Sequence, residues 1–256
     1  MIRLCSLASG SKGNAHFLHL CQKKILIDCG ISYKALKLRL GEIGEDVDSI
    51  DAVFVTHEHQ DHTRGLKLLC KNHSVPVFTN YQTANALYKD FEYVFDFKVF
   101  TTDEGFEYEG IEIVPFSIQH DALDPVGFTF SKEHKVGVCT DIGVVTSTVE
   151  HHLHTCDYLV FEANHEPELV HSCQKRTHIY KERVLSPFGH LANQECAHFL
   201  KKMDRIKHVI LAHLSQECNS VEYVEKAMEG LGMEYTIATQ DKVSSIVTDA
   251  AKAKSI

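Results

Sequence analysis

The chain has 256 residues, of which 44% are hydrophobic and 24% are charged, and its formal net charge is −9. This composition is ordinary for a globular protein with a sizeable core, and we expect one domain spanning residues 1–256. No run approaches about 18 apolar residues, which argues against a membrane span. The acidic balance argues against a protein that coats nucleic acid by charge alone.

The cysteines and the start of the chain bear on the compartment. Nine cysteines are an odd number and include no CxxC pair, which predicts reduced, mostly buried thiols instead of a disulfide framework. Residues 1–6 read as an early strand and lack a basic region followed by a long apolar core, so we infer no export signal. We therefore expect a cytoplasmic protein. The tail at 250–256 is expected to be mobile.

Short runs rich in valine, isoleucine and phenylalanine, bounded by glycine, proline, asparagine or aspartate, predict the strands. In chain order they cover residues 24–28, 52–56, 75–79, 111–118, 126–131, 136–140, 158–161, 209–212 and 243–248. Helical apolar spacing predicts helices over residues 33–43, 63–72, 81–89, 193–202 and 221–231. Because several strands are not followed by a helix, this α/β pattern favours two sheets packed face to face with helices outside.

Four potential metal ligands follow the predicted strand at 52–56 directly: His57, His59, Asp61 and His62. They cannot share one helix face, but in a tight turn at a strand end they can point into one cavity. His57 and His59 can hold one metal ion, and Asp61 and His62 can hold a second. Two ions about 3.5–4 Å apart polarise an oxyanion and make hydroxide available at neutral pH, and Asp61 can help to deprotonate the attacking water. The alternative is a histidine-rich surface turn.

This HxHxDH run resembles the signature of the metallo-β-lactamase superfamily, which implies a four-layer αββα sandwich. Further acidic and histidine positions of that superfamily are matched, in order and at predicted strand ends, by Asp28, His120, Asp141 and His213. The resemblance implies that His57, His59 and His120 hold one ion, that Asp61, His62 and His213 hold the other, and that Asp141 bridges them. Mixed nitrogen and oxygen ligands suit zinc, manganese or iron, and the sequence does not choose between these metals.

Two later segments resemble the nucleases of this superfamily. The run from Phe161 to His165, FEANH, and the run from Ser186 to Asn193, SPFGHLAN, resemble the His–Glu relay of tRNA-maturing phosphodiesterases and the phosphate-binding histidine of β-CASP nucleases. The resemblance implies that His190 contacts the scissile phosphate and protonates the leaving oxygen, that Glu162 orients His190, and that Asn164 contacts the substrate. The alternative is that His190 caps the next helix and Glu162 is structural.

The early segment from Leu7 to Asn14, LASGSKGN, resembles the opening of the YycJ/WalJ group of small bacterial nucleases. The THEHQDH, SIQHDALDPVGFTF, FEANH, GHLAN and LAHLS segments match that group in order, while Ala8 and Gln119 are departures that remove no ligand. The group implies a 5′-to-3′ DNA exonuclease. Ser9, Ser11 and Asn14 are candidate substrate contacts if this turn presents backbone N–H groups to a phosphate; alternatively, it only reverses the chain.

Charge distribution helps to separate the candidate functions. Residues 171–208 carry eight lysines and arginines against three acidic residues, which is compatible with a local basic face for a polyanion, but charge alone favours the alternative of two solvated helix faces. A small-molecule hydrolase for a thioester, lactone or cyclic nucleotide would not need that face, and neither would a binding module with a structural metal site. Histidines that match no ligand position are expected at the surface: His151, His152, His154, His171 and His178.

Overall fold

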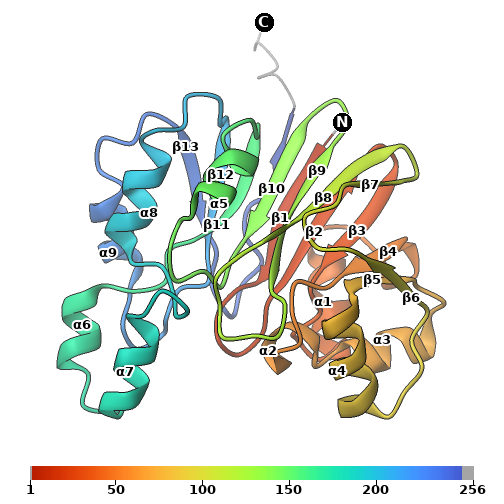
Figure 1. Ribbon diagram of the computed structural model, residues 1–256. Coiled ribbons are helices and arrows are strands. Elements are labelled where there is room, and N and C mark those ends of the chain that lie inside the picture. The colour runs from red at the N-terminus through yellow and green to blue at the C-terminus, as the bar shows by residue number, and fades with distance from the viewer. Residues whose placement is uncertain (1, 250–256) are drawn as a thin grey trace, which may run out of the picture.

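In the computed structural model, which describes residues 2–249, two seven-stranded sheets pack face to face and helices cover both outer sides (Figure 1). The four-layer αββα sandwich predicted from the sequence is confirmed. Each sheet buries one face against the other sheet and one face against helices, which is why most strands consist of consecutive apolar residues and do not alternate with polar ones.

The first sheet combines antiparallel and parallel pairing. Strands β1, β2 and β3 form an antiparallel meander, and β3 to β6 run parallel. In spatial order its strands are β14 (Val247–Thr248), β1 (Ile2–Ala8), β2 (Ala15–Leu20), β3 (Lys23–Ile27), β4 (Ala52–Phe54), β5 (Val77–Asn80) and β6 (Phe97–Phe100). Its outer face packs on α1 (Tyr33–Glu42), α3 (Leu66–Asn72) and α4 (Tyr81–Phe91) through a buried apolar cluster.

The second sheet also combines antiparallel pairing with parallel pairing. Strands β7 to β10 are antiparallel, and β10 to β13 run parallel. Its order is β13 (Glu234–Ile237), β12 (His208–Ala212), β11 (Tyr158–Glu162), β10 (Lys135–Cys139), β9 (Val126–Ser131), β8 (Ile111–Ser117) and β7 (Phe106–Tyr108). Its outer face packs on α5 (Ser147–Leu153), α8 (Asn193–Leu200) and α9 (Val221–Ala227).

Aromatic rings dominate the core between the sheets. Phe54 of the first sheet stacks on Phe78 at 4.5 Å between ring centroids and meets Phe128 and Phe130 of the second sheet edge to face at 5.7 and 5.2 Å. Full burial of each such ring stabilises the fold by about 1.5–3 kcal/mol. The two sheets are therefore held in a fixed relation, and so are the loops that leave their strand ends.

A short helical hairpin lies beside one end of the sandwich. It consists of α6 (Pro167–Ser172) and α7 (His178–Val184), which follow β11 in the chain, and we refer to it as the α6–α7 hairpin (Figure 1). Its small apolar cluster includes Val170, Val184 and Cys218. Two further short elements are η1 (Val47–Ser49) and α2 (Gln60–Thr63).

The predicted helices beginning at 33, 81, 193 and 221 start where the structure has them, and the one predicted from 63 begins at Leu66. The strand predicted over 243–248 is reduced to Val247–Thr248, and β2, β6, β7 and β13 were not predicted. Helices α5, α6 and α7 were missed because they are short and polar. All nine cysteines are free, as expected. No helix within residues 2–249 has the length and apolarity needed to cross a membrane. The tail at 250–256 lies outside the described residues.

Candidate metal centre

The chemical groups gather at one edge of the sandwich, where five strands end. His57 to His62 follow β4, His120 follows β8, Asp141 follows β10, Glu162 ends β11 and His213 follows β12. Strands β8, β10, β11 and β12 all point to this edge because β9 is antiparallel to both of its neighbours. The carboxyl ends of strands are the usual place for a ligand site in such sheets.

Three acidic or histidine residues leave their strands in the left-handed conformation. Asp28, Asp141 and His213 have φ values of 60°, 60° and 58°. This conformation costs roughly 1–3 kcal/mol for a residue other than glycine, so the surrounding contacts must maintain it. It turns the chain sharply at each strand end, and the side chains of Asp141 and His213 lie in the cluster described next.

Four overlapping sets of side chains lie close enough to hold a metal ion, and two of them consist only of ligands expected from the sequence. His57, His59 and His120 form one set, and Asp61, His62, Asp141 and His213 form the other, with the ligand atoms of each set within 4.8 Å of one another. Asp141 lies between them: its Oδ2 is 3.2 Å from His62 Nε2, and its Oδ1 is 3.3 Å from His213 Nε2 and 3.8 Å from His120 Nε2. The structure therefore brings together all seven side chains proposed from the sequence, with Asp141 near members of both sets.

Unpaired buried atoms indicate that these residues fit a cation. Asp141 Oδ2 and His213 Nε2 are buried and make no hydrogen bond with any residue that the structure describes, and Asp141 Oδ2 approaches His62 without hydrogen-bond geometry. An unpaired buried polar atom is costly, and two of them facing one point are explained by a bound ion. The mixture of imidazole and carboxylate ligands suits zinc, manganese or iron.

Carboxylates behind the histidines fix which ring nitrogen faces the cluster. Asp28 Oδ2 is 2.7 Å from His62 Nδ1, and Glu162 Oε1 is 3.1 Å from His213 Nδ1. Each carboxylate accepts the Nδ1 proton, which leaves Nε2 as the ligand atom. Asp28 therefore does not join the ligand sets. It also accepts hydrogen bonds from the backbone N–H and the hydroxyl of Thr56, which place it behind His62.

Glu162 also holds His190, the proposed acid. Glu162 Oε1 is 2.9 Å from His190 Nδ1, and Oε2 accepts a hydrogen bond of 2.6 Å from the backbone N–H of Ile142. Burial would raise the pKa of Glu162, but His190 and His213 outweigh it and lower that pKa. Glu162 is thus an ionised carboxylate that orients one histidine of the metal cluster and one histidine of the cleft. The suggestion that His190 merely caps a helix finds no support, because its Nδ1 faces Glu162.

The electrostatics of the centre favour bound positive charge. Burial would raise the pKa of Asp141, but His213, His62 and His120 outweigh it and hold that pKa well below its ordinary value. Burial lowers the pKa of His57 far below its usual range, so this imidazole is neutral and ready to bind a metal. Burial would also lower the pKa of His213, yet Asp141, Asp61 and Glu162 raise it to about 10. A divalent ion can replace that proton.

The turn between β1 and β2 contacts the candidate ligands from the protein interior. Ser9 and Asn14 are buried: Ser9 Oγ accepts a hydrogen bond from the backbone N–H of His213, and Asn14 Nδ2 lies 3.0 Å from His62 Nε2. The backbone N–H groups of Gly10, Lys12 and Gly13 are bonded within the protein. The turn therefore reverses the chain and positions ligands.

Close backbone packing ties this turn to the histidine motif. The backbone N–H of Asn14 donates to Asp61 O at 2.7 Å, and the N–H of Gly30 donates to Asn14 O at 2.8 Å. A Cβ atom at Gly30 would lie 1.5 Å from Asp61 O, so only glycine allows this approach. Asn164, also buried, braces the opposite side by donating to His213 O at 2.6 Å.

A cleft of about 530 Å³ opens over the cluster. Its walls include five of the seven candidate ligands and His190, together with groups from outside the centre such as Lys12, Arg176, Tyr180 and Arg183. The ring centroid of Tyr180, in α7, is 4.4 Å from Arg176 Cζ and 5.5 Å from Arg183 Cζ, so both guanidinium groups contact this ring. Ser11, proposed as a substrate contact, is exposed at this cleft. Lys12 and Tyr180 were not singled out from the sequence, where neither differs visibly from a surface residue.

The basic segment at 171–208 is divided between two ends of the molecule. Arg176 and Arg183 of the hairpin face the cleft. Arg205 and Lys207 instead surround Asp157, at the start of β11, while Glu162 ends that strand near the metal centre. The basic residues of this segment therefore lie in two places, and Arg176 and Arg183 are the ones that line the cleft. Four of the five histidines expected at the surface are exposed, and His152 stacks on Phe116.

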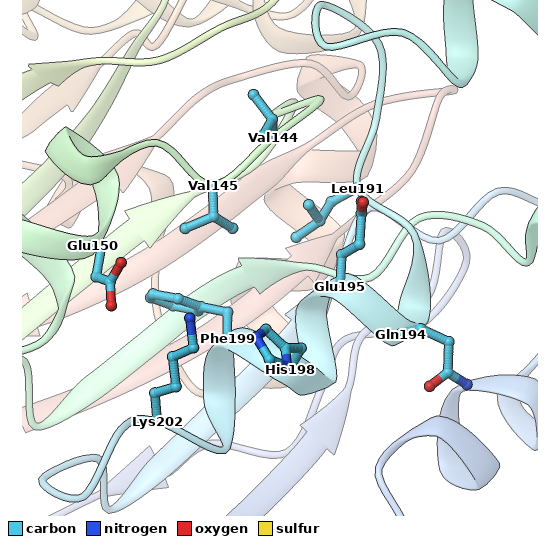
Figure 2. A pocket seen from close by; sticks show the side chains of 9 residues that line it. All are labelled: Val144, Val145, Glu150, Leu191, Gln194, Glu195, His198, Phe199 and Lys202. Carbon is cyan, nitrogen blue, oxygen red and sulfur yellow. The ribbon is translucent and has the colours of Figure 1, made fainter.

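A separate cavity of about 320 Å³ lies between α5 and α8 (Figure 2). Val145, Leu191 and Phe199 form its apolar side, and Glu150, Glu195 and Lys202 are among its polar groups. Its lining residues belong to none of the clusters that could hold a metal within the described part of the chain.

Known proteins share both the sequence pattern and the fold. Residues 23–214 match the β-lactamase superfamily domain. The exodeoxyribonuclease YycJ of Bacillus anthracis is 33% identical over 225 residues, 84% of this chain and 83% of that protein. The exodeoxyribonuclease WalJ of Streptococcus pneumoniae serotype 2 (strain D39 / NCTC 7466) is 32% identical over 230 residues, 87% of this chain and 85% of that protein.

Solved structures agree on the fold. The metallo-β-lactamase-fold protein YhfI from Bacillus subtilis superposes with a TM-score of 0.74 at 16% identity, over 95% of this chain and 99% of that one. The short form of human tRNase Z superposes with a TM-score of 0.67 at 19% identity, over 96% of this chain and 100% of that one. The chain therefore belongs to the β-lactamase superfamily and, within it, to the family that contains YycJ and WalJ.

Proposed function

We propose that the protein is a dinuclear metal-dependent phosphodiesterase that degrades DNA from the 5′ end. The observation that carries this proposal is the pair of ligand sets joined by Asp141, with His190 beside them and held by Glu162. The names of the relatives YycJ and WalJ, both exodeoxyribonucleases, support DNA as the substrate. The nine free cysteines further support a cytoplasmic location.

The chain's own residues divide the work. Divalent ions at the two ligand sets would polarise a phosphodiester and make hydroxide available at neutral pH. Asp61, whose side chain is 23% exposed, faces the cleft and can accept the proton of the attacking water. His190 has Nδ1 bound to Glu162, so its Nε2 is the atom that donates a proton to the leaving oxygen.

Substrate contacts come from the open side of the cleft. The guanidinium groups of Arg176 and Arg183 and the ammonium of Lys12 can bind backbone phosphates without reading sequence. Ser11 can add a hydroxyl to those contacts. Ser9, Asn14 and Asn164, which are buried against the ligands, are better suited to positioning than to contact with DNA.

The test is an assay of purified protein reconstituted with manganese or with zinc. The substrates are 5′-phosphorylated single- and double-stranded DNA and RNA labelled at the 3′ end. We expect stepwise release of nucleotides from the 5′ end of DNA. His59→Ala should lower the rate at least about a hundredfold, because loss of a residue that only hydrogen-bonds to a metal ligand already lowers activity by up to about a hundredfold. His154→Ala removes an exposed histidine outside the cleft and should have no effect.

Two outcomes would contradict the proposal. Full activity of His59→Ala would show that the first ligand set does not take part in the reaction. Failure of the metal-loaded protein to cleave any nucleic acid, with hydrolysis of a thioester, lactone or cyclic nucleotide instead, would identify a small-molecule hydrolase.

A further inference from the structure

Two cysteines that are far apart in the chain meet at the base of the α6–α7 hairpin. Cys173 caps the C-terminus of α6, and Cys218 lies in the loop that follows β12. Cys218 is buried in one apolar cluster with Val170 and Val184, and Cys173 packs against the same cluster. The two thiols are close enough to interact directly, and both are free. The hairpin and the loop after β12 thus touch through a pair of sulfur atoms.

Hydrogen bonds hold the backbone on both sides of this pair. The N–H of Glu166, just before α6, donates to Cys218 O at 2.9 Å, and the N–H of Cys218 donates to Ser215 Oγ at 3.1 Å. The N–H of Cys173 donates to Leu169 O at 3.0 Å. Because both backbone segments are held in this way, the two sulfur atoms remain neighbours.

The surroundings of the two thiols give them different parts in an oxidation. Cys173 is half-buried, so a small oxidant can reach it. The Arg176 guanidinium is close enough to interact electrostatically with its sulfur, which puts a positive charge beside the reacting thiolate. Burial and the neighbouring Cys173 raise the pKa of the Cys218 thiol. Cys173 is therefore suited to react first and Cys218 to attack the product.

Most other cysteines are shielded from such chemistry. Burial raises the pKa of Cys70 to about 12. It also raises the pKa of five fully buried thiols: Cys5, Cys29, Cys139, Cys156 and Cys196. Buried thiols in apolar surroundings are inert. Selective oxidation at the base of the hairpin therefore follows from where the cysteines lie.

We propose that Cys173 and Cys218 form an oxidation site at which hydrogen peroxide produces a reversible disulfide. The Cys173 thiolate attacks one peroxide oxygen, the O–O bond breaks, and the departing hydroxide takes up a proton to become water. The Cys218 sulfur then attacks the resulting sulfenic acid, the S–O bond breaks, and the hydroxyl leaves with the Cys218 proton as a second water. Two thiols are oxidised and one peroxide is reduced to two waters.

The disulfide would act on the wall of the cleft. The hairpin supplies Arg176, Tyr180 and Arg183 to that wall. Its links to the rest of the protein include ion pairs with Glu217 and Asp121, and pairs near the surface stabilise little. A bond between Cys173 and Cys218 adds a covalent link and restricts the unfolded chain. Oxidation therefore fastens the hairpin to the loop after β12. This inference goes beyond the proposed function and does not depend on it.

The experiment treats the reduced, zinc-loaded full chain with hydrogen peroxide and maps its peptides under non-reducing conditions. We expect a peptide that links Cys173 to Cys218 and that dithiothreitol separates. Cys173→Ser and Cys218→Ser should each abolish it, whereas Cys21→Ser, which removes another half-buried thiol, should retain it. Dimedone should trap sulfenic acid at Cys173 in Cys218→Ser. The oxidised protein should melt roughly 5 °C or more above the reduced one.

Each alternative result would overturn part or all of this inference. Absence of the linked peptide, a link to another cysteine, or a link between two chains would show that the pair is not an oxidation site. Dimedone labelling of Cys218 in Cys173→Ser would reverse the order of the two steps. Equal melting temperatures of the oxidised and reduced forms would show that the bond does not fasten the hairpin. None of these measurements involves DNA cleavage, so failure here leaves the proposed function standing.

Discussion

Glu162→Gln is the sharpest test of the centre because it changes one buried carboxylate and almost no volume. The carboxylate accepts hydrogen bonds from His190, His213 and the backbone N–H of Ile142. Glutamine keeps one carbonyl oxygen but puts an NH2 group in place of the other. At the Oε2 position that group would face the backbone N–H of Ile142, and at the Oε1 position it would face the Nδ1 protons of both histidines, which could then be accommodated only by moving to Nε2. For His213, Nε2 is the atom proposed to bind metal.

The expected loss follows from these contacts. A group behind a ligand typically changes metal affinity by about 10–100-fold. A positioned general acid contributes about 10²–10⁴-fold to the rate, and Glu162 orients that acid too. We therefore expect metal affinity to fall by about 10–100-fold and kcat/KM to fall by at least about a hundredfold even at saturating metal. An unsatisfied donor in the site should lower the free energy of unfolding by about 1–3 kcal/mol.

The assay measures metals bound per chain against a competing chelator, together with kcat/KM on DNA at saturating metal. Glu195→Gln, which neutralises an exposed glutamate on α8, is the matched control and should behave as wild type. Circular dichroism verifies that both variants are folded. If Glu162→Gln bound both metals with unchanged affinity and kept the wild-type rate, the role assigned to this carboxylate would be wrong.

Three further outcomes follow from the geometry. Gly30→Ala should lower the free energy of unfolding by about 3 kcal/mol or more, since its Cβ would overlap Asp61 O. Gly41→Ala, with nothing within 4 Å of the added Cβ, should instead stabilise helix α1 by up to about 1 kcal/mol. Equal melting temperatures of the two variants would contradict this reasoning. Burial would raise the pKa of Glu45, but the ion pairs with Lys24 and Arg3 outweigh burial and lower that pKa below 4.5. Its stabilisation is therefore present above pH 4.5 and lost as the pH falls further, so Glu45→Gln should be less stable by about 1–2 kcal/mol at pH 7 and should match wild type in acid, as measured by denaturant titration. Removal of the metals with a chelator should lower the melting temperature by roughly 5–10 °C when metal had been about a hundredfold above its Kd, and an unchanged melting curve would argue against bound ions.

Capping residues and apolar spacing in the sequence predicted many of the helices and strands. Helices α1, α4, α8 and α9 begin where capping residues and apolar spacing placed them, because Ser32, Asn80 and Ser220 bond the first turns of three of them. The α6–α7 hairpin was not predicted, because it has few apolar residues and packs through a small cluster of its own. Strands β6 and β7 lie at sheet edges, where half-exposed side chains weaken the pattern.

The sequence by itself determined that His57, His59, Asp61 and His62 would share one cavity, because they occupy six consecutive positions after a buried strand. Resemblance to known proteins added the distant ligands. Only the tertiary structure decided that Glu162 supports both His190 and His213, and that Lys12 and Arg176 line the same cleft. Those groups are far apart in the chain, and their meeting depends on the register of two packed sheets and on left-handed turns at the strand ends, which no local pattern specifies.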